Sequence, residues 1–91
     1  MTCFRTDSRE KLFVTFRSEE EIISFVEVCN RYDDAIDVRQ DRFVADAKSV
    51  MGMLLVELNI PHEVIYECFD DDDNYAEFRN EIAGRFAITT D

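Results

Sequence analysis

Basic residues, glycine, proline and histidine are all scarce in this chain of 91 residues. Ten Lys and Arg face 21 Asp and Glu, which gives a formal net charge of −11. Because nucleic-acid affinity comes largely from cations that displace counterions, this balance argues against nucleic acid and anionic membranes as partners. The same field attracts a basic protein, or a basic patch on one, with a measurable dependence on ionic strength. We therefore expect a protein partner with a basic surface.

Glycine and cysteine are too few, and wrongly spaced, for several kinds of site. The two glycines, Gly52 and Gly84, stand far apart and exclude a glycine-rich phosphate loop. The three cysteines, Cys3, Cys29 and Cys68, are odd in number and contain no CxxC pair. This argues against a disulfide framework and a structural zinc site, and Cys29 and Cys68 fit apolar patterns as small core residues. We expect no cofactor.

Acidic residues form two groups that superficially resemble functional sites. The run Asp70–Asn74 lacks the alternating ligands, central glycine and distal glutamate of an EF-hand calcium loop. We interpret it as capping acids on a solvated linker, and we expect no metal site. Asp37, Glu63 and Glu67 fall on predicted strands and resemble paired acid/base carboxylates, but nothing supplies a nucleophile or a pocket. We expect no enzyme and no catalytic residues.

Long apolar runs are also absent. The first ten residues contain no apolar run of signal-peptide length, and nowhere do eighteen apolar residues occur together, so we expect a cytoplasmic protein. Yet apolar residues make up 46% of the chain, which is too much for a disordered acidic tail. The length fits one small domain. We predict a single domain over residues 11–91, preceded by a tail or an extra extended segment over residues 1–10.

The order of local patterns predicts the fold class. A capping box at Ser18–Glu21 opens a helix whose apolar residues follow helical spacing up to Cys29. Alternation predicts a hairpin between residues 34 and 47. The other predicted elements are strands over 12–16 and 63–69, a short helix within 48–58 capped at Ser49 or a neighbour, and a last helix with apolar positions from Tyr75 to Phe86. The order β-α-β-β-α-β-α favours an α+β fold with an antiparallel sheet and helices on one face.

The second face of the predicted sheet is not cleanly polar. Phe13, Ile65 and Phe69 lie out of phase with the apolar residues next to them in the same strands. Exposed apolar surface of this kind needs a cover. We expect either the N-terminal tail or a second protomer there, so a homo-oligomer through the open sheet face is one prediction.

One segment resembles a known family. Ala47-Lys48-Ser49-Val50-Met51-Gly52-Met53 is similar to the regulatory-serine region of HPr, the phosphocarrier of the bacterial sugar phosphotransferase system, which typically reads leucine-lysine-serine-isoleucine-methionine-glycine. The resemblance extends over residues 11–86 through the predicted order of elements. It implies an open-faced β-sandwich, with a four-stranded antiparallel sheet and three helices on one face.

The chain departs from HPr where the family carries its chemistry. HPr has a glycine-isoleucine-histidine-alanine-arginine-proline loop there, and its histidine accepts the phosphoryl group at the start of the first helix. Here Arg17 leads directly into Ser18-Glu19-Glu20-Glu21, and three carboxylates repel a phosphate. The only histidine, His62, follows Pro61 at the entry of the last strand, far from the first helix in the predicted topology.

The resemblance also assigns two roles around the short helix. Ser49 matches the serine that HPr kinase phosphorylates in many Gram-positive HPr proteins; the alternative is that Ser49 only caps the helix. Val50 and Met51 match the apolar patch with which HPr docks onto its partners, and Arg17 is the one nearby cation. Leu54, Leu55 and Leu58 fit the core at least as well as the docking surface.

Three functional interpretations remain open at this point. The first is a non-catalytic, HPr-like regulatory or protein-binding module related to the sugar phosphotransferase system. The second is an HPr-type phosphocarrier that uses a non-standard acceptor such as His62. The third is a structural partner subunit with an unrelated acidic α+β fold.

Overall fold

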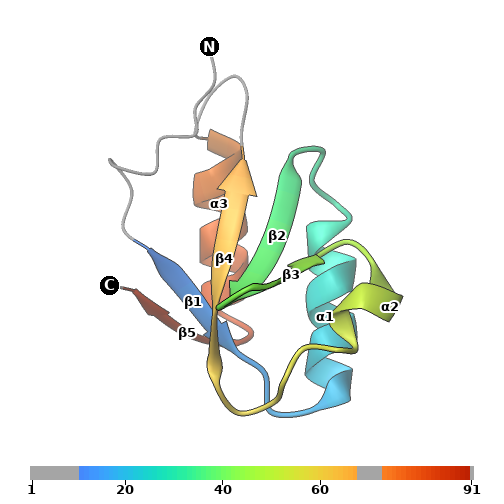
Figure 1. Cartoon of the computed structure of the whole chain (residues 1–91). Helices are drawn as coiled ribbons and strands as arrows, with labels where there is room; N and C mark the ends of the chain where they lie inside the picture. The colour runs from blue at the N-terminus through green and yellow to red at the C-terminus, as the bar shows by residue number, and fades with distance from the viewer. Residues whose placement is uncertain (1–10, 68–72, 91) are drawn as a thin grey trace.

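The structure, a computed structural model, describes residues 11–67 and 73–90. It is an α+β fold, as the sequence predicts (Figure 1). The elements in chain order are β1 (Leu12–Thr15), α1 (Glu19–Cys29), β2 (Ala35–Gln40), β3 (Phe43–Asp46), α2 (Val50–Met53), β4 (Pro61–Glu67), α3 (Asp73–Ala83) and β5 (Ala87–Thr90). No helix within the described ranges is long and apolar enough to cross a membrane.

The sheet is antiparallel throughout and has five strands in the order β3-β2-β4-β1-β5. The prediction of four strands is therefore wrong. Residues 87–90, placed beyond the last predicted helix, form β5 and pair along β1 at the sheet edge (Figure 1). The last helix is also shorter than predicted. Its apolar spacing was followed up to Phe86, but α3 ends at Ala83, and Phe86 enters the core from the turn after it.

Local sequence signals explain where α1 and the hairpin begin and end. The Ser18 hydroxyl accepts a hydrogen bond from the amide of Glu21, and the Glu21 carboxylate accepts one from the amide of Arg17. The predicted capping box is thus present at the start of α1. In the hairpin, β2 and β3 are joined through Asp41 and Arg42, and Asp41 adopts a positive φ of 53°. Aspartate tolerates this conformation better than most residues, which fits a tight turn here.

One face of the sheet packs against the helices. No helix of the described residues covers the other face, which we call the open face. Alternate residues of β1, β2 and β4 are buried, and α1 and α3 contribute apolar residues to the same core. The core centres on phenylalanines: Phe25 of α1 contacts Phe16 with ring centroids 5.1 Å apart, and Phe78 of α3 lies 6.2 Å away. Phe13 and Ile65 lie half-buried on the open face. Phe69, Cys68 and the expected tail over residues 1–10 lie outside the described residues.

Cys29 is fully buried, as the apolar pattern predicts. Burial raises the pKa of its thiol to about 12, while the charge of Lys48 lowers it and that of Asp46 raises it. In the unfolded chain this thiol loses its proton near pH 8.5–9. The unfolded state therefore binds fewer protons than the folded state above that pH, so stability falls as pH rises toward 12.

The measurement for Cys29 is urea unfolding at pH 8 and pH 10. Between these two values, the wild-type protein should lose about 1–2 kcal/mol more stability than a Cys29→Ala variant. The cavity left by Cys29→Ala lowers the free energy of unfolding equally at both pH values. The quantity to compare is therefore the change in the free energy of unfolding between pH 8 and pH 10 in each protein. Equal pH dependence of the two proteins would show that the Cys29 thiol ionises freely in the folded state.

Candidate functional site

The segment that resembles HPr forms a single helical turn, α2, held against α1. Ser49 is its N-cap, and the Ser49 hydroxyl accepts a hydrogen bond of 3.2 Å from the amide of Gly52. The Asn30 side chain at the end of α1 donates to the Lys48 carbonyl at 3.1 Å. The Lys48 ammonium donates in turn to the carbonyl of Tyr32. Ser49 is therefore the predicted cap, and Lys48 is occupied in fixing α2 to the rest of the fold.

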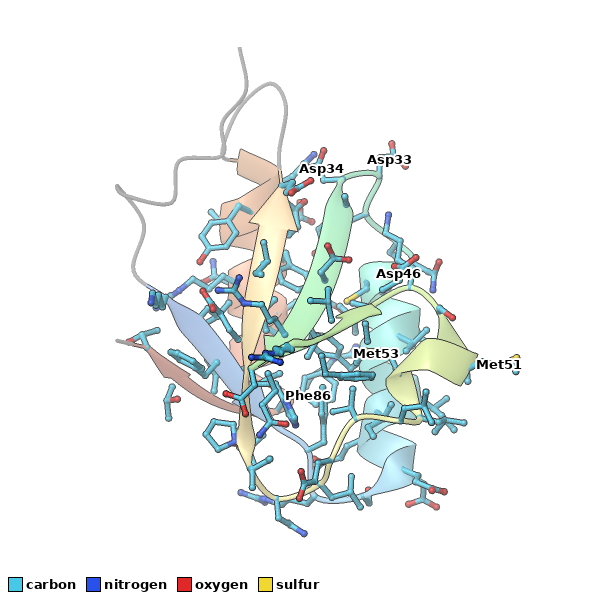
Figure 2. All side chains as sticks on the ribbon, in the orientation of Figure 1. Asp33, Asp34, Asp46, Met51, Met53 and Phe86 are labelled. Atoms are coloured by element: carbon cyan, nitrogen blue, oxygen red, sulfur yellow. The ribbon has the colours of Figure 1, made fainter. Side chains whose placement is uncertain are left out.

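The two methionines of α2 point in opposite directions. Met51 is 83% exposed, whereas Met53 is completely buried. Figure 2 shows Met51 at the outer side of α2, pointing away from the rest of the chain, and Met53 on the inner side. Val50 is also exposed. The two residues assigned to docking by resemblance thus lie on the surface, while the third apolar residue of the turn anchors it.

Two leucines that were left out of the expected docking set lie on the surface. Leu54 and Leu55 are 40% and 73% exposed, so of the two alternatives left open the surface holds for both. The reason is geometric: α2 ends at Met53, and in the turn that follows only Val56 reaches the interior. Leu58, by contrast, packs partly buried against the core.

A further apolar residue joins this surface from α1. Ile23 is 40% exposed and lies seven residues before Asn30. The Asn30 side chain donates a hydrogen bond to the carbonyl of Lys48, the residue before the Ser49 cap of α2. Residues seven apart share one face of a helix, so Ile23 lies on the side of α1 that faces α2. We define the α2 patch as Ile23, Val50, Met51, Leu54 and Leu55. The sequence signal for the two leucines is their spacing, four residues after Val50 and Met51.

Arg17 is exposed immediately before α1. Its backbone amide donates to the Glu21 carboxylate at 2.9 Å. No hydrogen bond or ion pair joins Arg17 to α2 within the described part of the chain. The structure thus groups Val50 with Met51 but does not tie Arg17 to them.

His62 is a core residue. Its side chain is only 1% exposed, and its Nε2–H donates to the Glu57 carbonyl oxygen at 2.7 Å. The expectation that it lies far from the first helix is wrong, because β4 pairs with β1 and sets His62 opposite Val14. Its ring stacks on Phe16, two residues before the α1 cap, at a centroid distance of 6.4 Å. His62 is thus near the start of α1 in space but closed off from a phosphoryl donor.

The three carboxylates singled out in the sequence, Asp37, Glu63 and Glu67, lie in β2 and β4. Glu63 forms an ion pair with Arg39 at 2.8 Å. Asp37 lies opposite Asp46 in the hairpin, and desolvation, reinforced by the charges of Asp46 and Glu67, raises the pKa of Asp37. Among the described residues, no three His, Cys, Asp or Glu side chains are placed to hold a metal ion. The expected capping role of Asp70–Asn74 falls largely outside the described residues.

The raised pKa of Asp37 predicts a stabilising substitution. A carboxyl whose pKa is raised by folding binds more protons in the folded state, so its contribution to stability is lost as pH rises through that pKa. At pH 7 the Asp37→Asn variant should therefore be more stable than the wild type by about 0.2–1 kcal/mol, since it removes like charges on paired strands. The gain should shrink at pH 4 and in high salt. Urea unfolding measures it, with the exposed loop substitution Asp33→Asn as a charge-matched control. A gain no larger than that of the control would contradict the prediction.

A polar pocket between the end of α1 and α3 has no counterpart in the sequence interpretation. It encloses about 280 Å³ and is lined by Arg31, Tyr32, Asp33, Asn74, Glu77 and Glu81. The Tyr32 hydroxyl donates to Glu81 at 3.0 Å, and Arg31 pairs with the same carboxylate. Desolvation raises the pKa of Glu81, but the bonds from Tyr32 and Arg31 outweigh it, so the pKa is lowered. These groups satisfy one another and link α1 to α3.

No protein-family model matches the sequence, and neither the curated proteins nor the solved structures give a significant match.

Proposed function

We propose that this chain is a non-catalytic, HPr-like protein-binding module that acts through the α2 patch. The observation that carries this proposal is the exposure of five apolar side chains around the segment that resembles HPr, with Met51 and Leu55 the most exposed. Hydrogen bonds from the Asn30 and Lys48 side chains hold the turn in place, so the patch is presented on a fixed support. Apolar surface that is adaptable through methionine suits protein docking.

The carrier role is the weaker alternative. Glu19 and Glu20 are exposed and Glu21 is half-exposed in the first turn of α1, where an HPr carrier receives its phosphoryl group. His62, the only histidine, is buried and donates to a backbone carbonyl. To accept a phosphoryl group, His62 would have to leave the core and break this hydrogen bond.

Phosphotransfer separates these two functions. The chain is incubated with enzyme I and phosphoenolpyruvate, beside an ordinary HPr as positive control. We expect no acid-labile phosphate on this chain while the control is labelled. A phosphohistidine at His62 would overturn the non-catalytic proposal and establish the carrier alternative.

A regulatory role for Ser49 has its own test. The Ser49 hydroxyl caps α2, so phosphorylation would require it to give up the Gly52 amide. Incubation with HPr kinase and ATP, followed by peptide mass spectrometry, detects the modification directly. A phosphopeptide containing Ser49 would add regulation to the proposed module. Absence of label beside a labelled control HPr would leave Ser49 as a cap.

The α2 patch is a better docking surface for a partner than the open sheet face. The open face carries Asp37 and Asp46 opposite each other, together with the half-buried Phe13 and Ile65. A second copy of a chain with net charge −11 would bring these like charges together. We therefore place the partner at the α2 patch and give it a basic surface, as the charge balance favours. Homo-oligomerisation through the open face is the less favoured arrangement.

A further inference from the structure

We infer that the α2 patch binds an amphipathic α-helix of a partner protein, with apolar residues on one side of that helix and Lys or Arg beside them. The inference rests on the proposed function and identifies the kind of partner. It follows from three properties of the patch: the hydrogen bonding of its backbone amides, the spacing of its side chains and the charge of its rim.

Four consecutive backbone amides in the second half of the patch are already paired within the chain. The amides of Met53, Leu54, Leu55 and Val56 already donate to carbonyls three or four residues earlier, at 2.9 to 3.2 Å. An extended peptide pressed against this apolar surface would therefore have unpaired backbone groups, and burying such groups is costly. A helix satisfies its own backbone and presents only side chains.

The side chains of the patch are spaced to receive a helix. Val50 and Leu54 form one i, i+4 pair, and Met51 and Leu55 form the next. Leu54 continues the turn of α2 by one residue, since its amide donates to the Val50 carbonyl. The Val50 and Leu54 side chains are therefore neighbours on one surface, against which a second helix can pack. Ile23 from α1 extends the surface beyond α2. A partner helix with apolar residues at i, i+3, i+4 and i+7 fits this arrangement.

The rim of the patch is acidic on the α1 side. Three exposed glutamates flank Ile23 along α1. Glu19 and Glu20 lie four and three residues before it, and Glu27 lies four residues after it. Residues at these spacings neighbour Ile23 on the helix surface. The nearest lysine, Lys48, is held by the Tyr32 carbonyl. Basic side chains flanking the apolar face of the partner helix would therefore complement this rim.

Two other occupants of the patch are disfavoured by the same charges. A second copy of the chain would set one glutamate rim against another. An anionic lipid surface would be repelled by the rim and by the net charge of −11.

The test is a titration followed by ¹H–¹⁵N NMR, with designed peptides of about 18 residues as probes. The first peptide has leucines on one helical face and lysines on the other. The second has the same composition but a permuted order without helical periodicity, and the third carries glutamate in place of lysine. We expect the first to bind at least about tenfold more tightly than either of the others. Its binding should shift the amide signals of the α2 patch and weaken in about 0.3 M salt.

Matched variants locate the binding. Met51→Ser with Leu55→Ser should weaken binding of the first peptide at least about tenfold. Val44→Ser, an exposed position on the open sheet face, should leave it unchanged. Glu20→Gln with Glu27→Gln should weaken binding and flatten its salt dependence, whereas the equal charge change Asp33→Asn with Glu77→Gln should have a smaller effect.

Three results would overturn the inference. They are equal binding of the permuted peptide, signal changes spread over the surface rather than centred on the patch, and a patch-dependent dimer of the protein by sedimentation. If a partner protein is cross-linked at position 51 in cells but the first peptide does not bind, the proposed function stands. Only the inference that the partner segment is a basic amphipathic helix is then refuted. Failure of both would remove the proposed function as well.

Discussion

Replacing Phe25 with alanine is expected to lower the free energy of unfolding by about 3–5 kcal/mol. Phe25 is completely buried, and its ring makes edge contacts with Phe16, Phe78 and Phe86 at centroid distances of 5.1, 6.2 and 5.4 Å. These rings come from three separate parts of the chain, so truncation leaves a cavity where the sheet and both longer helices meet. Small domains are stable by about 5–15 kcal/mol, so this is a large part of the total.

Urea unfolding monitored by circular dichroism measures the effect of Phe25→Ala. The matched control is Ile23→Ala, which truncates an apolar side chain two positions earlier on the same helix but at a 40% exposed site. The control should cost about 1 kcal/mol or less. Equal losses for the two variants would contradict the described core, because they would mean that α1 does not bury the Phe25 face.

Replacing Met51 and Leu55 together with serine is expected to weaken partner binding by at least about thirtyfold, the effect of a single strong anchor residue. The free energy of unfolding should stay within about 1 kcal/mol of the wild type, because both side chains are mostly exposed. Met53→Ala should show the opposite pattern. It removes a buried side chain of the same turn, so it should cost about 2–5 kcal/mol of stability.

Binding of the double variant and of Met53→Ala is measured against the partner obtained by cross-linking, with urea unfolding of each protein in parallel. Binding is compared at a temperature where Met53→Ala remains folded. Unchanged binding by the double variant would remove the α2 patch from the interface. A large loss of stability in the double variant would instead show that these side chains belong to the core.

The sequence predicted the elements whose signals are local. The capping box at Ser18, the alternation of the hairpin strands and the cap at Ser49 each depend on residues within a few positions of one another. The structure has these features where they were predicted. It also confirms the burial of Cys29, which the helical spacing of α1 places on the core face.

Features that depend on distant pairing were missed or misplaced. The strand β5 is only four residues long, and its pairing with β1 joins segments more than seventy positions apart. Its β-branched residues Ile88, Thr89 and Thr90 were the only local signal. The position of His62 beside the start of α1 likewise depends on the pairing of β4 with β1, which no local pattern specifies.

The candidate site was predicted in part. Val50 and Met51 were assigned to the docking surface, but Leu54 and Leu55 were left out of it because the core suited them at least as well. The helix stops after one turn, which leaves both leucines outside. Ile23 was missed because its neighbour Ile22 continues the apolar face of α1, and only the packing of α1 against α2 brings Ile23 to the patch.

Site-specific photo-cross-linking in the cells that make this protein tests the central claim most directly. A photoreactive phenylalanine analogue replaces Met51 in one version and Thr89, an exposed residue of the edge strand β5, in another. We predict a distinct cross-linked protein from position 51 that is absent from position 89 and is lost when Leu55 is also changed to serine. The same adducts from both positions, or none from position 51, would contradict a docking role for the α2 patch.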